Sequence, residues 1–290
     1  MDREQRIRAR ARLALRAEQA FGLRAIRHNP AGQLSDPAPG ESTDQATARA
    51  SASSSVEQTL VGSVDLFGRS TIKKPVQVSL PAMDAFTTQV LSRREKVQRL
   101  NELDSREVRG CTRCRLCEQR TNTVFGEGDP DAKVIFIGEG PGENEDIQGR
   151  PFVGRAGELL NSMIVGMGLK REQVFIANIV KCRPPGNREP APDEVATCTP
   201  YLERQIEIIR PQVIVTLGRP AAQHMLQSKI SISRIRGQWM AWRGIKLMPT
   251  FHPAYILRNY TPETRAAVWD DLKKVLAELG LPVPSRGRAS

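Results

Sequence analysis

Residues 133–146 read KVIFIGEGPGENED, and this stretch decides the fold that we expect. Its first six residues form a short, nearly continuous apolar run, which is typical of a strand buried on both faces of a sheet. Three similar runs follow along the chain, at 173–180 (QVFIANIV), 212–217 (QVIVTL) and 245–251 (IKLMPTF).

Helix-like stretches separate and follow these runs, at 155–168, 192–209, 219–227 and 263–279. Strands that alternate with helices predict an α/β fold in which helices cover both faces of a parallel sheet. Residues 107–280 suffice for one such domain.

The composition narrows the class of protein. The chain has 290 residues, 43 Lys+Arg against 32 Asp+Glu, and a net charge of +11. It has neither an apolar run of about 18 residues nor a secretory signal, so we expect a cytoplasmic protein without a membrane span. Five cysteines are too few for a disulfide scaffold. The positive charge predicts a nucleic-acid partner, with a plain solvated basic surface as the alternative.

The N-terminal part differs in composition from the rest. Residues 1–28 predict a basic helix-like segment; an organelle-targeting presequence is an alternative that the acids at Asp2, Glu4 and Glu18 oppose. Residues 29–84 begin with a stretch rich in Pro, Gly, Ser, Ala and Thr and predict a disordered linker. We expect a helical lead-in at 85–106 and a flexible tail at 281–290.

One short peptide lies inside the expected linker. Ser63–Phe67 (SVDLF) resembles the peptide with which bacterial replication and repair proteins dock on the sliding clamp. The alternative is a chance Leu-Phe pair.

The cysteines form a second pattern. Cys111 and Cys114 have CxxC spacing, and Cys182 and Cys198 follow from a second segment. Four thiolates from two segments suit a tetrahedral zinc or an iron–sulfur cluster, and spacing does not choose between them. Cys117 has the same spacing from Cys114 and is a competing ligand, while free buried cysteines are the structural alternative.

Polar and glycine-rich segments follow the predicted strands. The loop 138–146 comes after the first, Asn178 ends the second, and His252 follows the fourth. Each feature also has a separate structural explanation: the loop is then a tight turn, Asn178 caps a turn, and His252 is a structural histidine. Because the carboxyl ends of parallel strands meet at one edge, the set predicts a site for a flat heterocycle such as a nucleobase.

At this point the chain from Gly110 to Leu279 resembles the iron–sulfur uracil-DNA glycosylases, family four of that superfamily. The motifs that carry the resemblance are 111–116 (CTRCRL), 125–128 (FGEG), 138–146, 149–157 (GRPFVGRAG), 178–185 (NIVKCRPP), the segment around Cys198, and 252–258 (HPAYILR). The resemblance implies a three-layer α/β/α sandwich around a four-stranded parallel sheet. It also implies a [4Fe–4S] cluster held by Cys111, Cys114, Cys182 and Cys198, with Cys117 as a bystander.

The resemblance implies roles for single residues around a flipped-out uracil. Phe152 would stack on the base, Asn178 would bond its polar edge, Glu145 would crowd the C5 position, and His252 would donate to O2 of the departing base. Gly140 is a further uracil-binding residue that we expect. Better-known uracil glycosylases carry a water-activating aspartate at this position, so the neighbouring Glu139 is our candidate base.

DNA contacts are expected on both sides of this site. The candidates are Arg150, Arg155, Tyr255, Ile256, Leu257 and Arg258. Apolar residues after His252 would wedge into the base stack. Alternatively, Ile256 and Leu257 are ordinary core residues at the start of a helix.

The predicted function is a monomeric repair glycosylase that hydrolyses the N-glycosidic bond of uracil in DNA and leaves an abasic site. A non-excising uracil-DNA-binding protein of the same fold is one alternative, and a glycosylase for other deaminated bases is another. A covalent trap through a histidine after the second strand is disfavoured, because residues 183–192 contain no histidine.

Overall fold

The structure is a computed structural model that describes residues 90–284. The predictions for residues 1–28, for the linker 29–84 with its Ser63–Phe67 peptide, and for residues 285–290 lie outside the described residues.

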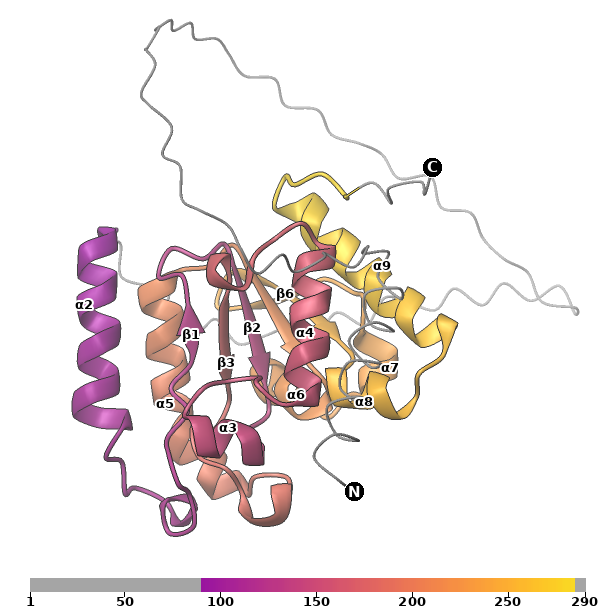
Figure 1. The fold of residues 1–290 in the computed structure, drawn as a ribbon. Coiled ribbons are helices and arrows are strands. Elements are labelled where there is room, and N and C mark those ends of the chain that lie inside the picture. The colour runs from indigo at the N-terminus through magenta and orange to yellow at the C-terminus, as the bar shows by residue number, and fades with distance from the viewer. Residues whose placement is uncertain (1–89, 285–290) are drawn as a thin grey trace, which may run out of the picture. The chain divides into compact units, whose positions relative to one another are not determined.

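Six strands form one sheet in the order β1-β3-β2-β4-β6-β5 (Figure 1). The four central strands are parallel and are β2 (Val134–Gly138), β3 (Phe175–Asn178), β4 (Val213–Leu217) and β6 (Ile245–Thr250). They are the four strands that the apolar runs predict.

The expected total of four strands is wrong, because a short antiparallel strand is added at each edge. These are β1 (Glu127–Gly128), which pairs with β3, and β5 (Met240–Trp242), which pairs with β6. Strands of two and three residues are too short to produce a hydrophobic pattern.

Helices cover both faces of the sheet and confirm the three-layer sandwich. α2 (Arg93–Leu103), α5 (Pro192–Ile209) and α6 (Arg219–Leu226) bury side chains in one core together with Ile135 and Ile137 of β2. On the other face, Val134 and Phe136 share a second core with three helices, which are α4 (Arg155–Gly166), α8 (Pro253–Arg258) and α9 (Pro262–Glu278). Successive side chains of β2 thus serve opposite cores.

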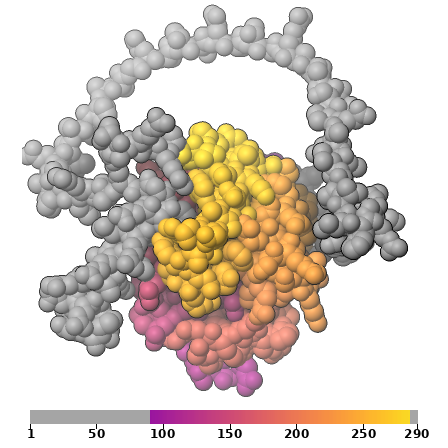
Figure 2. Space-filling model, turned by 90° about the vertical axis from the view of Figure 1, so that its right-hand side faces the viewer, coloured from indigo at the N-terminus to yellow at the C-terminus, as the bar shows by residue number. Residues whose placement is uncertain are grey.

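A helix lies near each end of the described chain. At the start, Ser92 and Glu95 form a capping box for α2, which continues into a π-helical turn at Asp104–Val108. At the end, α9 packs against β6, and Figure 2 shows the yellow C-terminal residues lying directly against the orange ones.

No helix within residues 90–284 is long and apolar enough to cross a membrane.

Two short helices interrupt regions without a helical pattern. α3 (Glu143–Gln148) lies inside the glycine-rich segment expected to be a loop, and α7 (Ile232–Ile235) precedes β5. Gly142 is the N-cap residue of α3, and three acids occupy its first turn, where the helix dipole favours negative charge.

Candidate active site

A cleft of about 680 Å³ opens at the carboxyl ends of the parallel strands. It lies where ligands bind in parallel α/β sheets. Its walls include most of the predicted site residues, namely Glu139, Gly140, Glu145, Phe152, Asn178, His252, Tyr255 and Arg258. The structure therefore brings together residues spread over more than a hundred positions of the sequence.

Asn178 is the last residue of β3, and its side chain is buried in the cleft wall. Its Oδ1 atom is buried without a hydrogen-bond partner among the described residues. A Cβ at Gly138, its partner in β2, would lie 2.4 Å from Oδ1 and 2.6 Å from the Phe152 ring. Gly138 thus lets the amide and the ring sit side by side. An unsatisfied buried acceptor costs about 1–3 kcal/mol, which a ligand N–H would offset.

His252 is the N-cap residue of α8. Its Nδ1 atom accepts a hydrogen bond from the Ala254 N–H at 3.0 Å, and its ring centroid lies 5.7 Å from that of Phe152. Burial, assisted by the positive charge of Arg258, lowers the pKa of His252 to about 4. The imidazole is therefore neutral at pH 7, and since Nδ1 accepts, the proton is assigned to Nε2.

Glu145 of α3 holds the loop that carries Phe152 by hydrogen bonds. Glu145 accepts hydrogen bonds through Oε1 from the N–H groups of Val153 at 2.8 Å and Gly154 at 2.7 Å. Phe152 itself has a φ of 49°, in the left-handed region that bulky residues avoid. Glu145 lines the cleft and at the same time holds the strained loop.

Glu139 is the carboxylate that follows β2 in the cleft. Burial raises its pKa, the nearby Glu189 raises it further, and Arg219 opposes both. Its neighbour Gly140 has no room for a side chain, because a Cβ there would lie 2.8 Å from Cγ2 of Val180. An aspartate at position 140 is therefore sterically excluded, whereas Glu139 faces the cleft.

The predicted DNA-contact residues of α8 are not equally accessible. Tyr255 is 39% exposed, and Arg258 is exposed beside it on the cleft rim. Leu257 is half-buried against the second core, and Ile256 is fully buried inside it. A DNA contact by Ile256 is therefore not available in this structure, because the side chain is buried in the second core, where α8 packs against α4.

The two predicted DNA-contact arginines before α4 and at its start lie outside the cleft wall. Arg150 is 59% exposed and forms an ion pair with Glu127 at 2.8 Å. Arg155 is exposed as the first residue of α4.

The four cysteines predicted as ligands gather beside the first core. Cys182 and Cys198 are buried within that core, and Cys111 and Cys114 pack against it. Burial raises the pKa of Cys114 and Cys182, and that of Cys198 to about 11, and the thiols raise one another's pKa further. Four mutually close thiols fit the donor set of a zinc ion or a cluster, whose positive charge stabilises thiolates.

N–H donors already point at these sulfurs. Arg120 donates to Cys182 Sγ at 3.2 Å, and the backbone N–H of Lys181 donates to Cys198 Sγ at 3.3 Å. Within residues 90–284 no three His, Cys, Asp or Glu side chains converge as a site for a single metal ion. Cys117 is half-buried and lies close enough to Cys114 to affect its pKa.

Sequence reasoning missed Lys181, which links the cysteines with the cleft. Its side chain is fully buried, and Nζ donates to the Asn178 carbonyl at 3.0 Å and to Gln205 Oε1 at 2.6 Å. A lysine directly after an apolar run is the one local signal that marks it, since a buried charge needs partners.

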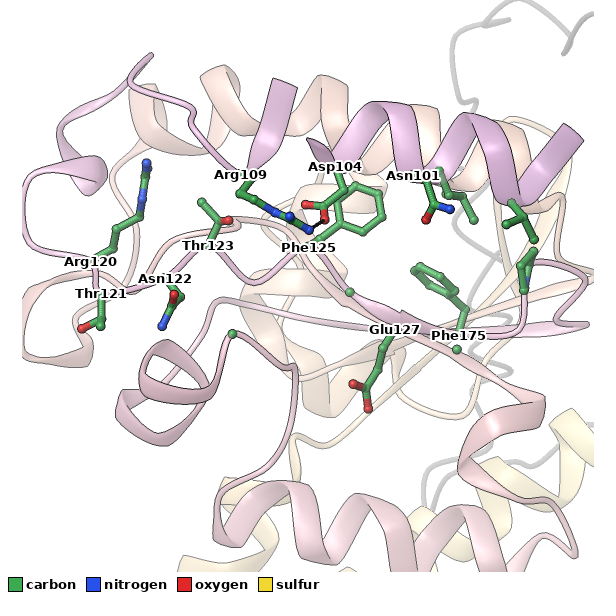
Figure 3. A pocket seen from close by; sticks show the side chains of 16 residues that line it. Asn101, Asp104, Arg109, Arg120, Thr121, Asn122, Thr123, Phe125, Glu127 and Phe175 are labelled. Carbon is green, nitrogen blue, oxygen red and sulfur yellow. Dashed lines mark hydrogen bonds and ion pairs between the residues drawn. The ribbon is translucent and has the colours of Figure 1, made fainter. Parts of the chain in front are cut away.

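A second hollow of about 540 Å³ lies between α2 and the edge strand β1 (Figure 3). Asp104 and Arg109 form an ion pair at 2.8 Å on its helix side, and Glu127 and Phe175 lie on the strand side. None of the predicted catalytic, uracil-binding or cysteine residues lines this hollow.

The fold and the cleft define the class of protein, and comparison with known families agrees. The sequence model of the uracil DNA glycosylase superfamily matches residues 125–273. The chain belongs to the uracil DNA glycosylase superfamily.

Several relatives carry a more specific name. The chain is 50% identical over 179 residues to a type-4 uracil-DNA glycosylase of Thermotoga maritima. The matched region covers 61% of this chain and 93% of that protein. A type-4 uracil-DNA glycosylase of Sulfurisphaera tokodaii is 49% identical over 178 residues, with 58% and 80% covered. One of Saccharolobus solfataricus is 49% identical over 183 residues, with 60% and 84% covered.

Proposed function

We propose that this protein is a repair glycosylase that excises uracil from DNA. The observation that carries the proposal is the buried Asn178 Oδ1 without a partner, set beside the Phe152 ring and the neutral His252. An acceptor, an aromatic face and a neutral donor are what a uracil ring requires. The names of the type-4 relatives support the same activity.

Recognition begins when the target nucleotide leaves the base stack and enters the cleft. Phe152 supplies a stacking face. The Asn178 amide accepts from uracil N3–H and donates to O4. Cytosine presents an acceptor at N3 and a donor at N4, so both bonds fail. One mismatched buried polar group costs about 1–3 kcal/mol, or about 5- to 150-fold.

Bond cleavage is assigned to His252 and Glu139. As the C1′–N1 bond breaks, its electron pair stays on the uracil, and the His252 Nε2–H donates to the developing negative charge on O2. Such donors supply the largest electrostatic term in many enzymes. A water then bonds to C1′ of the oxocarbenium-like sugar and gives its proton to Glu139, whose raised pKa suits a general base. Free uracil and an abasic site result.

Discrimination against thymine is assigned to Glu145. Its carboxylate lines the cleft while Oε1 holds the amides of Val153 and Gly154. In this assignment the carboxylate crowds the C5 position, where thymine carries its methyl group. DNA contact falls to Tyr255 and Arg258 on the cleft rim, and to the exposed Arg150 and Arg155.

We also propose that Cys111, Cys114, Cys182 and Cys198 hold a [4Fe–4S] cluster rather than zinc. A zinc ion at about 2.3 Å from each sulfur keeps the sulfurs within about 4 Å of one another, whereas a cluster bonds each thiolate to a separate iron. The resemblance of the cysteine motifs to those of the iron–sulfur uracil-DNA glycosylases supports the cluster. When bound, the cluster supplies structural cross-linking and no redox step.

The test is incubation of the full chain with a uracil-containing oligonucleotide, followed by alkaline cleavage at abasic sites. We expect cleavage with uracil and none with thymine mismatches. Retention of the uracil strand without cleavage would instead indicate a binding protein, and cleavage of inosine strands would indicate a broader glycosylase.

Beyond the described residues, we propose that Ser63–Phe67 docks on a sliding clamp and that the protein acts as a monomer in the cytoplasm. Deletion of residues 63–67 should abolish clamp binding and leave uracil excision unchanged. Absence of clamp binding by the full chain contradicts the docking proposal, and a dimer mass in solution contradicts the monomer.

A further inference from the structure

The loop that carries Phe152 needs a support that the proposed mechanism does not name. Phe152 has a φ of 49°, which is sterically disfavoured for a residue with a bulky side chain. The carbonyl of Phe152 also packs against α4 so closely that a Cβ at Gly157 would lie 1.9 Å from it. The ring reaches the cleft only while this backbone conformation is held.

Hydrogen bonds from two sides account for the loop's polar backbone groups. Glu145 accepts from the N–H groups of Val153 and Gly154. On the opposite side, Arg171 donates through Nη2 to the Pro151 carbonyl at 2.5 Å and through Nη1 to the Phe152 carbonyl at 3.4 Å. Two carbonyls and two amides around the strained residue are thereby fixed.

Two further acceptors hold the Arg171 side chain. Nη1 also donates to Asn161 Oδ1 at 2.6 Å, and Nε donates to Glu127 Oε1 at 2.7 Å. Its side chain is 15% exposed, and that of Glu127 is 25% exposed. The planar fork of a guanidinium can satisfy several acceptors in fixed directions at once, which an ammonium group cannot do.

We infer that Arg171 is a positioning residue of the uracil site, which holds Phe152 in its left-handed conformation so that its ring forms the stacking face. The inference rests on the proposed function. Arg171 does not line the cleft, so it acts only through the loop. A shift of about 1 Å in a reacting group can cost about 100-fold in rate.

A double-mutant cycle on uracil excision by the full chain tests the inference. Arg171→Gln should lower kcat/KM by about 100-fold, and Phe152→Ala should lower it at least as much. If Arg171 acts through the ring, the double variant should be within about twofold of Phe152→Ala. Arg171→Lys should restore little, because one ammonium cannot reach the Pro151 carbonyl, Asn161 and Glu127 together.

A matched control separates positioning from general loss of stability. Arg243 is 16% exposed and pairs with Glu203 and Glu207 on the far edge of the sheet. Arg243→Gln should lower the melting temperature comparably and leave kcat/KM within about twofold of the wild type. Equal loss of kcat/KM in this control would overturn the inference.

Two further results would also overturn it: near-normal excision by Arg171→Gln, or losses that multiply fully in the double variant. Absence of excision by the wild type would instead contradict the proposed function itself, so the two failures are distinguishable.

Discussion

The cleft and the cysteine centre both depend on the segment after β3, yet they are held in different ways. In the cleft, hydrogen bonds from Glu145 and the Arg171 side chain fix the loop that presents the ring. In the cysteine centre, Cys182 and Cys198 receive one N–H bond each, and burial raises the pKa of both thiols. The chain preorganises the first site by itself, whereas on our proposal the second is completed only by a bound cluster, whose positive charge stabilises thiolates. On that proposal, removing a ligand should damage the fold, whereas removing a cleft residue should damage mainly the chemistry.

The largest effect is expected from Cys182→Ala. Loss of one proposed ligand should remove the brown colour and the iron, and should lower the free energy of unfolding by at least about 4 kcal/mol, since a bound structural metal centre contributes directly to folding. Visible absorbance, iron analysis and thermal unfolding measure these changes. Cys117→Ala is the control and should keep the colour. A colourless wild type with one zinc would contradict the cluster, and equal damage by Cys117→Ala would contradict the ligand set.

His252→Ala should lower kcat by about 100- to 1,000-fold, because it removes the donor to the charge that develops on O2. The fold should be retained, with a loss of about 1 kcal/mol in unfolding free energy from the missing N-cap, which thermal unfolding checks. The matched control is His224→Ala: His224 is also partly buried with a lowered pKa, but it bonds to Thr199 away from the cleft. Excision by the His252 variant at a rate near that of the control would contradict the proposed role of His252 as the donor to O2.

The same contrast explains how much the sequence could predict. The strands β2, β3, β4 and β6 were predictable because buried parallel strands leave continuous apolar runs. Asn178 and His252 were predictable as neighbours because both lie at the carboxyl ends of predicted parallel strands. The two-residue β1 leaves no pattern, and nothing in the local sequence marks the positive φ of Phe152, since it is imposed by contacts with Arg171, Glu145 and α4.

Residues that act at a distance were the hardest to find. Ile256 was expected at the DNA surface because it lies shortly after His252, but one face of a short helix packs into the core, here against α4. Lys181 and Arg171 gained their roles only through partners far away in the chain, such as Gln205 and Glu127.

Asn178→Ala should have a smaller effect than His252→Ala, of about 5- to 150-fold in kcat/KM. The loss falls on recognition, so the preference for uracil over cytosine should weaken with it. Competition between uracil and cytosine oligonucleotides measures the preference, with Asn101→Ala as a control outside the cleft. An unchanged preference together with a lower kcat would place Asn178 in the chemical step alone.

The smallest expected effect is a shift in the acid limb of the pH profile. Glu139 has a raised pKa and is active as the carboxylate, so excision should decline as the pH falls through a value above 4.5. His252 stays neutral until the pH approaches about 4, so it does not cause this decline. In Glu139→Gln the slow remaining excision should become independent of pH over this range. A profile that follows an ordinary histidine near pH 6.5 instead would contradict the neutral imidazole.

The left-handed backbone at Phe152 changes how substitutions there have to be interpreted. An alanine at position 152 removes the ring but retains the strain, which is about 1–2 kcal/mol for a left-handed residue with a Cβ, whereas a glycine removes both. The difference in unfolding free energy between Phe152→Ala and Phe152→Gly therefore measures what the enzyme sacrifices in stability to display one aromatic face. A family member with glycine at this position would gain that stability and lose the stacking contact with the base.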